Sequence, residues 1–167
     1  MSKECYEYVV DMDLEKFFDT VCQSKLIEVL SRTIKDGRVI SLIHKYLNAG
    51  VIANGMYERT EIVMHKGGPL SPSLSNIMLN ELDKELERRG HRFVRYADDC
   101  MIFCKSRKSA ERTLKNILPF IEGKLFLKVN RKKTEVAHVL NQIFSNKIIA
   151  KLGYTSMLDY YLIVYEN

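Results

Sequence analysis

The spacing of apolar residues along the chain alternates between the two-residue period of a strand and the period of a helix, about 3.6 residues. Tyr8-Val9-Val10-Asp11-Met12 is a short apolar run that predicts a strand ending at Asp13. Asn54-Gly55 lies between two further apolar runs, which is a hairpin signal. We expect helices at residues 24–33, 39–48, 71–89 and 108–122, and strands at residues 8–13, 51–53, 56–63, 92–95, 101–104, 126–129 and 135–140.

This order of elements predicts an α+β fold in which helices pack on one face of an antiparallel sheet. The runs on either side of Tyr96-Ala97-Asp98-Asp99-Cys100 indicate a central hairpin. No repeat, low-complexity segment or linker divides the chain, and 167 residues suffice for one domain with a core of its own. We expect that domain at residues 1–140, followed by a C-terminal tail at residues 141–167.

Three aspartates fall at strand ends and turns: Asp13 ends the first strand, and Asp98 and Asp99 lie in the central hairpin. Alone, an aspartate in a turn indicates no more than the turn. If these strands lie side by side, however, three carboxylates converge at one end of the sheet. Their mutual repulsion is then relieved by a divalent cation, and two such cations suit an in-line phosphoryl displacement.

Composition narrows the class of protein only modestly. The formal net charge of +5 fits a polyanionic partner without requiring one. The four cysteines form no Cys-x-x-Cys pair and the four histidines are scattered, so a zinc site is not expected, and the cysteines suit burial in a reducing compartment. No apolar run has the length of a membrane span, and the N-terminus does not resemble a signal peptide. We expect no membrane association and a cytoplasmic location.

Four sequence blocks define a family resemblance. They are Asp13-Leu14-Glu15-Lys16-Phe17-Phe18-Asp19, Gly67-Gly68-Pro69-Leu70-Ser71-Pro72-Ser73-Leu74-Ser75-Asn76, Arg95-Tyr96-Ala97-Asp98-Asp99 and Asn130-Arg131-Lys132-Lys133-Thr134. In order and spacing they resemble the palm of the reverse transcriptases encoded by bacterial group II introns, also called maturases. The resemblance extends from about residue 8 to residue 134. It implies an RNA-directed DNA polymerase, a nucleotidyltransferase that adds deoxynucleotides to a DNA 3′ end with two Mg²⁺ ions, for which Mn²⁺ substitutes.

The same resemblance assigns roles to single residues. It implies that Asp13, Asp98 and Asp99 form the catalytic, metal-holding cluster, that the backbone carbonyl of Leu14 joins them as a ligand, and that Lys133 approaches the triphosphate. It makes Phe18 the ring that excludes a 2′ hydroxyl, although on residue type alone either Phe17 or Phe18 suits the core. Further substrate-contacting positions are Lys66, Gly67, Gly68 and Pro69. The implied partners are an RNA template, a DNA primer, deoxynucleoside triphosphates and group II intron RNA.

Two departures from the family pattern leave an alternative open. Lys66 stands where relatives carry a neutral glutamine, and the finger and thumb segments of relatives are not found in this sequence. The isolated chain is therefore expected to polymerise poorly or not at all, and the alternative is a truncated, inactive RNA-binding module of maturase type. Surfaces left uncovered by fingers and thumb are compatible with a homo-oligomer. A nucleotide cyclase of palm type is disfavoured, because its Gly-Gly-Asp/Glu-Glu-Phe hairpin is replaced by Tyr96-Ala97-Asp98-Asp99.

Overall fold

The computed structural model describes residues 6–49, 51–53, 56–58 and 69–144. Its elements agree closely with those expected from the spacing of apolar residues, including a short hairpin around Asn54-Gly55. The strands are β1 (Tyr8–Asp13), β2 (Val51–Ala53), β3 (Met56–Glu58), β4 (Arg92–Tyr96), β5 (Asp99–Cys104) and β6 (Glu135–His138). The helices are α1 (Phe17–Thr20), α2 (Gln23–Thr33), α3 (Gly37–Asn48), α4 (Ser71–Arg88), α5 (Arg107–Gly123) and α6 (Val139–Phe144).

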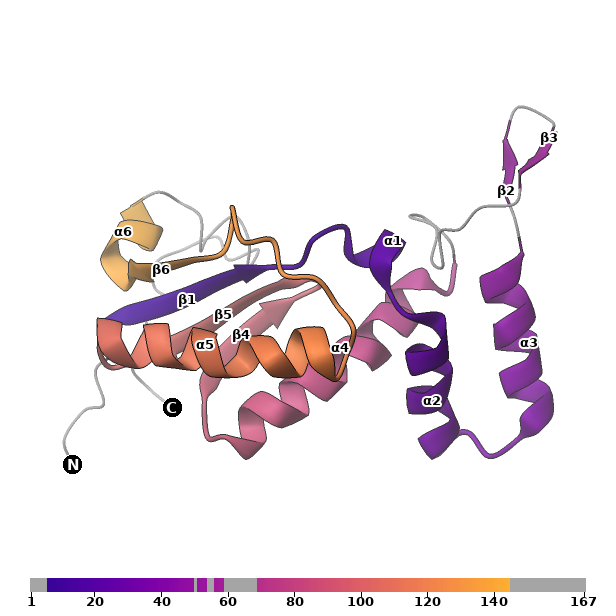
Figure 1. Cartoon of the computed structure of the whole chain (residues 1–167), viewed down its shortest axis with the longest axis horizontal. Helices are drawn as coiled ribbons and strands as arrows, with labels where there is room; N and C mark the ends of the chain where they lie inside the picture. The colour runs from indigo at the N-terminus through magenta and orange to yellow at the C-terminus, as the bar shows by residue number, and fades with distance from the viewer. Residues whose placement is uncertain (1–5, 50, 54–55, 59–68, 145–167) are drawn as a thin grey trace.

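Four strands form one antiparallel sheet in the order β4-β5-β1-β6, and β2 and β3 pair separately (Figure 1). The first strand of the chain therefore lies inside the sheet, between β5 and β6. Its residues are apolar on both faces: Val9 and Val10 are both fully buried. Burial of both faces explains why β1 reads as a continuous apolar run, whereas a half-exposed strand would alternate.

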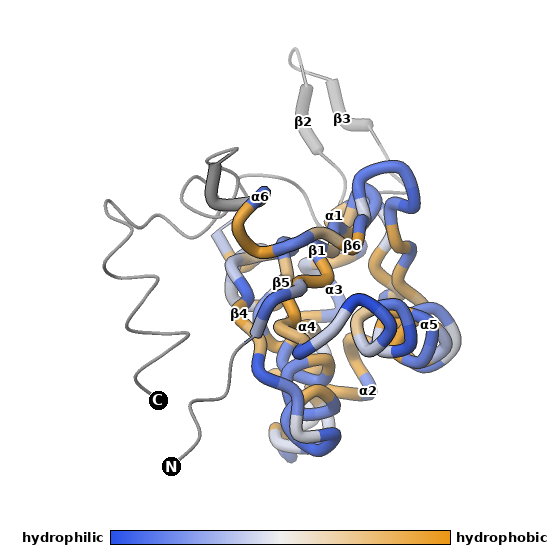
Figure 2. Tube along the Cα trace, turned by 90° about the vertical axis from the view of Figure 1, so that its left-hand side faces the viewer, coloured by the Kyte–Doolittle hydropathy of each residue, from blue (hydrophilic) through white to orange (hydrophobic). Residues whose placement is uncertain are grey.

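Helices α4 and α5 run along one face of the sheet, and α2 packs beside α4 (Figure 1). The main core lies between this face and the helices. It joins Val10 and Met12 of β1 to Leu82 of α4 and Ile117 of α5, all of them completely buried. Figure 2 shows hydrophobic residues along β1 and β5 in the middle of the molecule. This arrangement confirms the expected α+β fold with the larger helices on one face of an antiparallel sheet.

The opposite face of the sheet carries a second, smaller apolar cluster. It contains Val9, Met101, Phe103 and Val139, of which the last begins α6. Successive residues of a strand point to opposite faces, so this cluster and the main core divide β1 and β5 between them. Asp13 and Asp99 belong to the same alternating set as Val9 and Met101, and therefore lie on the face away from α4 and α5.

Two expected strands differ from the structure. Residues 126–129 form no strand; only Val129 makes an isolated bridge, to Leu14. Phe126 has a φ of 56°, a left-handed conformation that interrupts an extended backbone. The neighbouring apolar side chains, Leu125 and Leu127, are buried in the core without forming a strand. The second prediction was partly wrong: the strand expected at residues 135–140 ends at His138, and α6 begins at Val139. The boundary expected at residue 140 falls within α6, and the division into domain and tail stays a prediction.

Candidate active site at one end of the central strands

The register of the sheet brings two of the three predicted carboxylates together. Asp13, the last residue of β1, is paired directly with Asp99, the first residue of β5. Residues paired in this way lie about 5 Å apart between Cα atoms and point to the same face. Asp98 immediately precedes Asp99 in the tight turn that joins β4 to β5. The three aspartates therefore gather at one end of the two central strands, as the sequence predicted.

The turn that carries Asp98 has an unusual backbone. Ala97 has a φ of 52°, in the left-handed region where residues other than glycine pay a conformational cost of roughly 1–2 kcal/mol. Strained backbone persists only where the surroundings fix it, and it is concentrated at functional sites. Arg95 supplies that restraint, because its Nη1 atom donates a hydrogen bond of 2.8 Å to the carbonyl oxygen of Ala97.

Arg95 is itself held by helix α4. Its Nε and Nη2 atoms donate to the two carboxylate oxygens of Asp83 at 2.8 and 2.7 Å, and Nη1 lies 3.3 Å from Oδ1 of Asn76. The hydrogen bonds to Asp83 raise the pKa of the Arg95 guanidinium above its ordinary value. A bidentate pair of this kind fixes orientation as well as charge. The hairpin turn is thereby tied to two positions of α4, seven residues apart.

The block Asn130-Arg131-Lys132-Lys133-Thr134 also contacts Asp13. The Asp13 backbone N–H donates to Thr134 Oγ1 at 3.3 Å, and the Asp13 carbonyl accepts from the Asn130 N–H at 2.9 Å. Lys133 Nζ lies 3.7 Å from Oδ1 of Asp13, and its side chain is 70% exposed. Residues more than a hundred positions apart in sequence thus meet at the end of β1, and a cation stands beside the carboxylates.

A cavity of about 530 Å³ opens next to Asp98. Phe18 lines it and is partly buried, whereas Phe17 is 2% exposed in the main core, and the two rings meet edge to face at 5.5 Å. Both rings thus border the cavity, but Phe17 is almost completely buried and Phe18 is the more exposed of the two. The remaining lining residues come from the N-terminal half of α4, the end of β4 and the turn after it: Pro72, Ser75, Asn76, Leu79, Arg95, Tyr96, Ala97 and Asp98.

The donor set at this site suits a hard divalent cation, because it consists of carboxylate oxygens from Asp13, Asp98 and Asp99. Within the part of the chain that the structure describes, however, no three His, Cys, Asp or Glu side chains stand close enough together to hold one ion. Asp13 is also near Lys133, a cation that stands 3.7 Å from its carboxylate. The three aspartates are thus neighbours along the backbone, but their side chains do not converge on one point.

The other predicted site residues have different outcomes. Leu14 is 4% exposed, and its side chain belongs to the main core, as expected for a residue that would contribute only its carbonyl. Pro69 lies in an exposed turn directly before α4. Lys66, Gly67 and Gly68 lie outside the described residues, so their predicted contacts with substrate stay predictions.

Asp83 was missed by sequence reasoning, although it holds Arg95 in place. It stands seven residues after Asn76 on α4, and therefore on the same side of the helix. That spacing becomes informative only once Arg95 is known to face α4. Thr134 was recognised as part of a block, but its hydrogen bond to the Asp13 backbone depends on a non-local contact that no local pattern reveals.

Comparison with solved structures identifies the class of fold. The chain superposes on apo telomerase from Candida tropicalis, truncated from its C-terminal domain, with a TM-score of 0.61 and 18% identity, over 78% of this chain and 30% of that one. This is the palm-like fold of a polymerase. Residues 1–156 match the family model described as reverse transcriptase (RNA-dependent DNA polymerase), and the chain belongs to that family.

Curated relatives agree with this assignment. Protein YkfC of Escherichia coli K12 is 30% identical over 79% of this chain and 44% of its own length. The group II intron-encoded protein LtrA of Lactococcus lactis subsp. cremoris is 27% identical over 78% of this chain and 33% of its own length. The chain thus spans less than half the length of these relatives. No helix among the described residues is both long enough and apolar enough to cross a membrane.

Proposed function

We propose that this chain is the palm of an RNA-directed DNA polymerase of group II intron type, and that it adds deoxynucleotides to a DNA 3′ end. The observation that supports this most directly is the cavity beside Asp98, because Phe18 and Asp98 line the same space and Asp98 directly precedes Asp99, the residue paired with Asp13. A volume of about 530 Å³ is within the usual range for small-molecule sites. The incoming nucleotide occupies this cavity in our proposal.

Asp13, Asp98 and Asp99, with the Leu14 carbonyl, would hold Mg²⁺ or Mn²⁺. The metal ions would activate the primer hydroxyl and neutralise charge on the triphosphate. The protein's own part is to keep the carboxylates at one edge, and the Arg95–Asp83 pair positions the turn for this purpose. Because like charges repel, a cation would lower the free energy of bringing the three side chains together.

Lys133 and Phe18 would act on the nucleotide itself. The Lys133 ammonium is exposed beside Asp13, where it can approach the negatively charged triphosphate and stabilise the charge that develops on the leaving group. The Phe18 ring lines the cavity and would pack against the sugar, leaving no room for a 2′ hydroxyl. Lys66, Gly67, Gly68 and Pro69 would lie beside the template, the primer and the nucleotide.

The partners in this proposal are an RNA template, a DNA primer and deoxynucleoside triphosphates. Family membership supports nucleic acid as the partner class, and the printed name of LtrA refers to a group II intron. Group II intron RNA is therefore included as a proposed partner. The rival function is an RNA-binding module of maturase type that no longer polymerises.

Metal binding by the isolated chain separates the proposal from this rival. We expect Mn²⁺, detected by electron paramagnetic resonance, to bind the unaltered chain, and Asp13→Asn or Asp98→Asn to weaken binding about tenfold or more. Asp19→Asn is the matched control, because Asp19 is an exposed carboxylate on α1, six residues after Asp13, that does not belong to the predicted metal ligands. Equal binding by Asp98→Asn and Asp19→Asn would overturn the metal site and favour the inactive module.

A further inference from the structure

Helix α5 carries three basic side chains on the side that faces away from the core. Lys108, Arg112 and Lys115 are spaced by four and three residues, so they form one stripe along the helix, and all three are exposed. The buried residues of the same helix are Ala110, Thr113, Ile117 and Ile121, on the opposite side. The stripe is therefore directed into solvent over its whole length.

This basic stripe is not neutralised by neighbouring carboxylates. Among the described residues, Lys108, Arg112 and Lys115 form no ion pair. The two glutamates of α5 are engaged elsewhere: Glu111 accepts from Arg107 at 3.0 Å, and Glu122 is paired with Arg131 at 2.7 Å. The positive charge on this side of α5 is therefore uncompensated by the protein.

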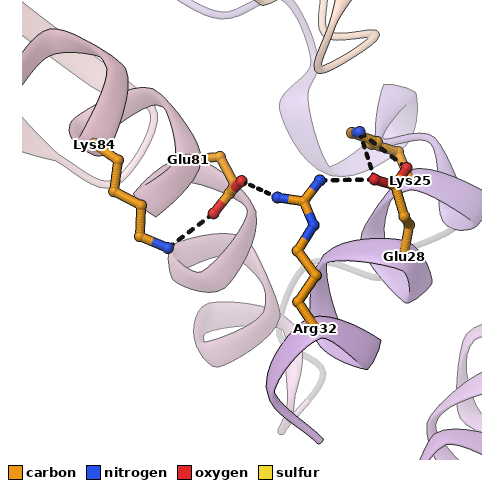
Figure 3. Close-up of polar contacts among 5 residues, drawn as sticks. All are labelled: Lys25, Glu28, Arg32, Glu81 and Lys84. Atoms are coloured by element: carbon orange, nitrogen blue, oxygen red, sulfur yellow. Dashed lines mark hydrogen bonds and ion pairs between the residues drawn. The ribbon is translucent and has the colours of Figure 1, made fainter. Parts of the chain in front are cut away.

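Basic residues of α2 and α4 are arranged differently. Figure 3 shows Lys25 and Arg32 of α2 and Lys84 of α4 each bound to Glu28 or Glu81. Further along α4, Arg88 is bound to Glu85 at 2.7 Å. On α2 and α4, basic residues and glutamates thus form local pairs, which produce little net field. The stripe on α5 lacks this local pairing, which is the feature that requires an explanation.

A hollow adjoins the start of the stripe. Its volume is about 280 Å³, and its lining includes Arg92 of β4 and Ser109 of α5 itself. This region lies beyond Cys104, the residue of β5 farthest from Asp99, so about five residues of strand, or roughly 17 Å, separate it from the carboxylates. The surface is consequently distinct from the cavity beside Asp98.

We propose that the outer face of α5 is a second nucleic-acid contact, which binds the phosphate backbone of an RNA duplex. Seven residues of helix spread the stripe over about 10.5 Å along the axis of α5, so its cations can contact more than one phosphate of a duplex backbone. The exposed residues of α5 include no aromatic side chain on which an unpaired base could stack. The chemistry thus favours paired RNA, recognised by charge and shape without readout of sequence.

Two double variants test this proposal with the same change in net charge. Lys108→Gln/Arg112→Gln removes a lysine and an arginine four residues apart on α5. Lys84→Gln/Arg88→Gln removes the same pair of residue types at the same spacing on α4, where glutamates already neutralise them. Binding of a blunt-ended RNA duplex is measured by fluorescence anisotropy over a series of salt concentrations.

We expect the α5 variant to weaken binding about tenfold at low salt and to reduce the slope of log K against log salt by about 1.8, the loss of two phosphate contacts. The α4 variant should change affinity less than about twofold. Equal losses in both variants would overturn the proposal, because net charge alone would then explain them. No loss in the α5 variant would overturn it as well.

A footprint on the unaltered chain gives an independent answer that does not depend on any variant folding. Acetylation of lysines is followed by mass spectrometry with and without the RNA duplex. Lys108 and Lys115 should be protected, whereas Lys84 should react equally in both samples. Unchanged reactivity at Lys108 and Lys115 would overturn the contact. Neither measurement involves metal or nucleotide, so the outcome is separate from that of the proposed polymerase site.

Discussion

Phe18 is the residue on which nucleotide selection depends in the proposed site. Its ring lines the cavity beside Asp98 and is supported edge to face by the buried ring of Phe17. Phe18→Ala should remove the bulk that excludes a 2′ hydroxyl, so the preference for a deoxynucleotide over the matching ribonucleotide should fall about tenfold. Titration with both nucleotides in the presence of Mn²⁺ measures the ratio of dissociation constants without requiring extension.

Phe18→Tyr is the control, because it keeps the ring and should keep the preference. Phe17→Ala differs in kind: Phe17 is 2% exposed, and its truncation should destabilise the fold by about 3–5 kcal/mol. If the ratio of dissociation constants for Phe18→Ala equals that of the unaltered chain, Phe18 has only a packing role.

Arg95 holds the strained turn at Ala97 by joining it to Asp83. Both side chains are largely buried, at 12% and 19% exposure, so the pair is shielded from water. Arg95→Lys keeps the charge but loses the bidentate geometry, and should destabilise the chain by about 1–2 kcal/mol. Urea unfolding measures this change. Arg92→Lys, an exposed substitution on the same strand, should cost less than about 0.5 kcal/mol; a similar cost for both would show that the Asp83 pair contributes nothing specific.

At the level of elements, Glu85 of helix α4 should make the free energy of unfolding depend on pH. Hydrogen bonds from Arg88, and then from Arg89, lower the pKa of Glu85 from 4.5 to about 2. A depressed carboxylate pKa adds stability above the unfolded pKa and loses it as the pH falls toward the folded value. The contribution of Glu85 should therefore be complete above about pH 5 and decline between pH 4.5 and about 2.

Glu85→Gln tests this expectation. At pH 7 the variant should be less stable by roughly 0.5 kcal/mol, a value limited by the exposure of the Arg88 side chain. The difference should shrink as the pH is lowered from 4.5, which urea unfolding at several pH values measures. Glu87→Gln, an exposed substitution on the same helix, should show no such trend. A difference that stays constant down to pH 3 would contradict the ion-pair explanation.

The four longer helices, α2 to α5, were predicted from sequence because each has a local cause, whereas the short helices α1 and α6 were not predicted. Leu74, Met78, Leu82 and Leu86 recur at helical spacing on α4 and are buried in the structure, and Asp36 caps α3 with its side chain. Residues 126–129 could not be predicted in the same way. Their apolar residues suggest a strand, but the local backbone conformation at Phe126 and packing of Leu125 and Leu127 against distant elements decide the outcome.

The candidate site shows the same division. The blocks containing Asp13, Asp98 and Asp99 indicated which carboxylates belong together, and the register confirms that Asp13 and Asp99 are neighbours. Arg95 was recognised as part of the block that contains Asp98 and Asp99, and the structure shows it bound to Asp83, Asn76 and Ala97. A sequence shows that an arginine is present but not which partner it reaches, because that depends on how β4 meets α4.

At the scale of the whole molecule, the described surfaces predict how the isolated chain behaves in a polymerase assay. It has a candidate metal site and cavity but spans less than half the length of its curated relatives, so it need not carry every surface that orients template and primer. Positioning supplies much of the rate of phosphoryl transfer. Residues 1–167 alone should therefore extend a primer on an RNA template poorly or not at all in Mg²⁺. Robust processive synthesis would refute this expectation.

The central place of β1 in the sheet has a consequence for how the protein is made. The partner strand β5 leaves the ribosome only after roughly 90 residues more than β1, which take on the order of 5–20 s to synthesise. Throughout that interval a strand whose Val9 and Val10 end fully buried has neither neighbour. Unpaired apolar strands invite association with other chains. The same topology that brings Asp13 to Asp99 thus leaves β1 open to association with other chains until β5 has been translated.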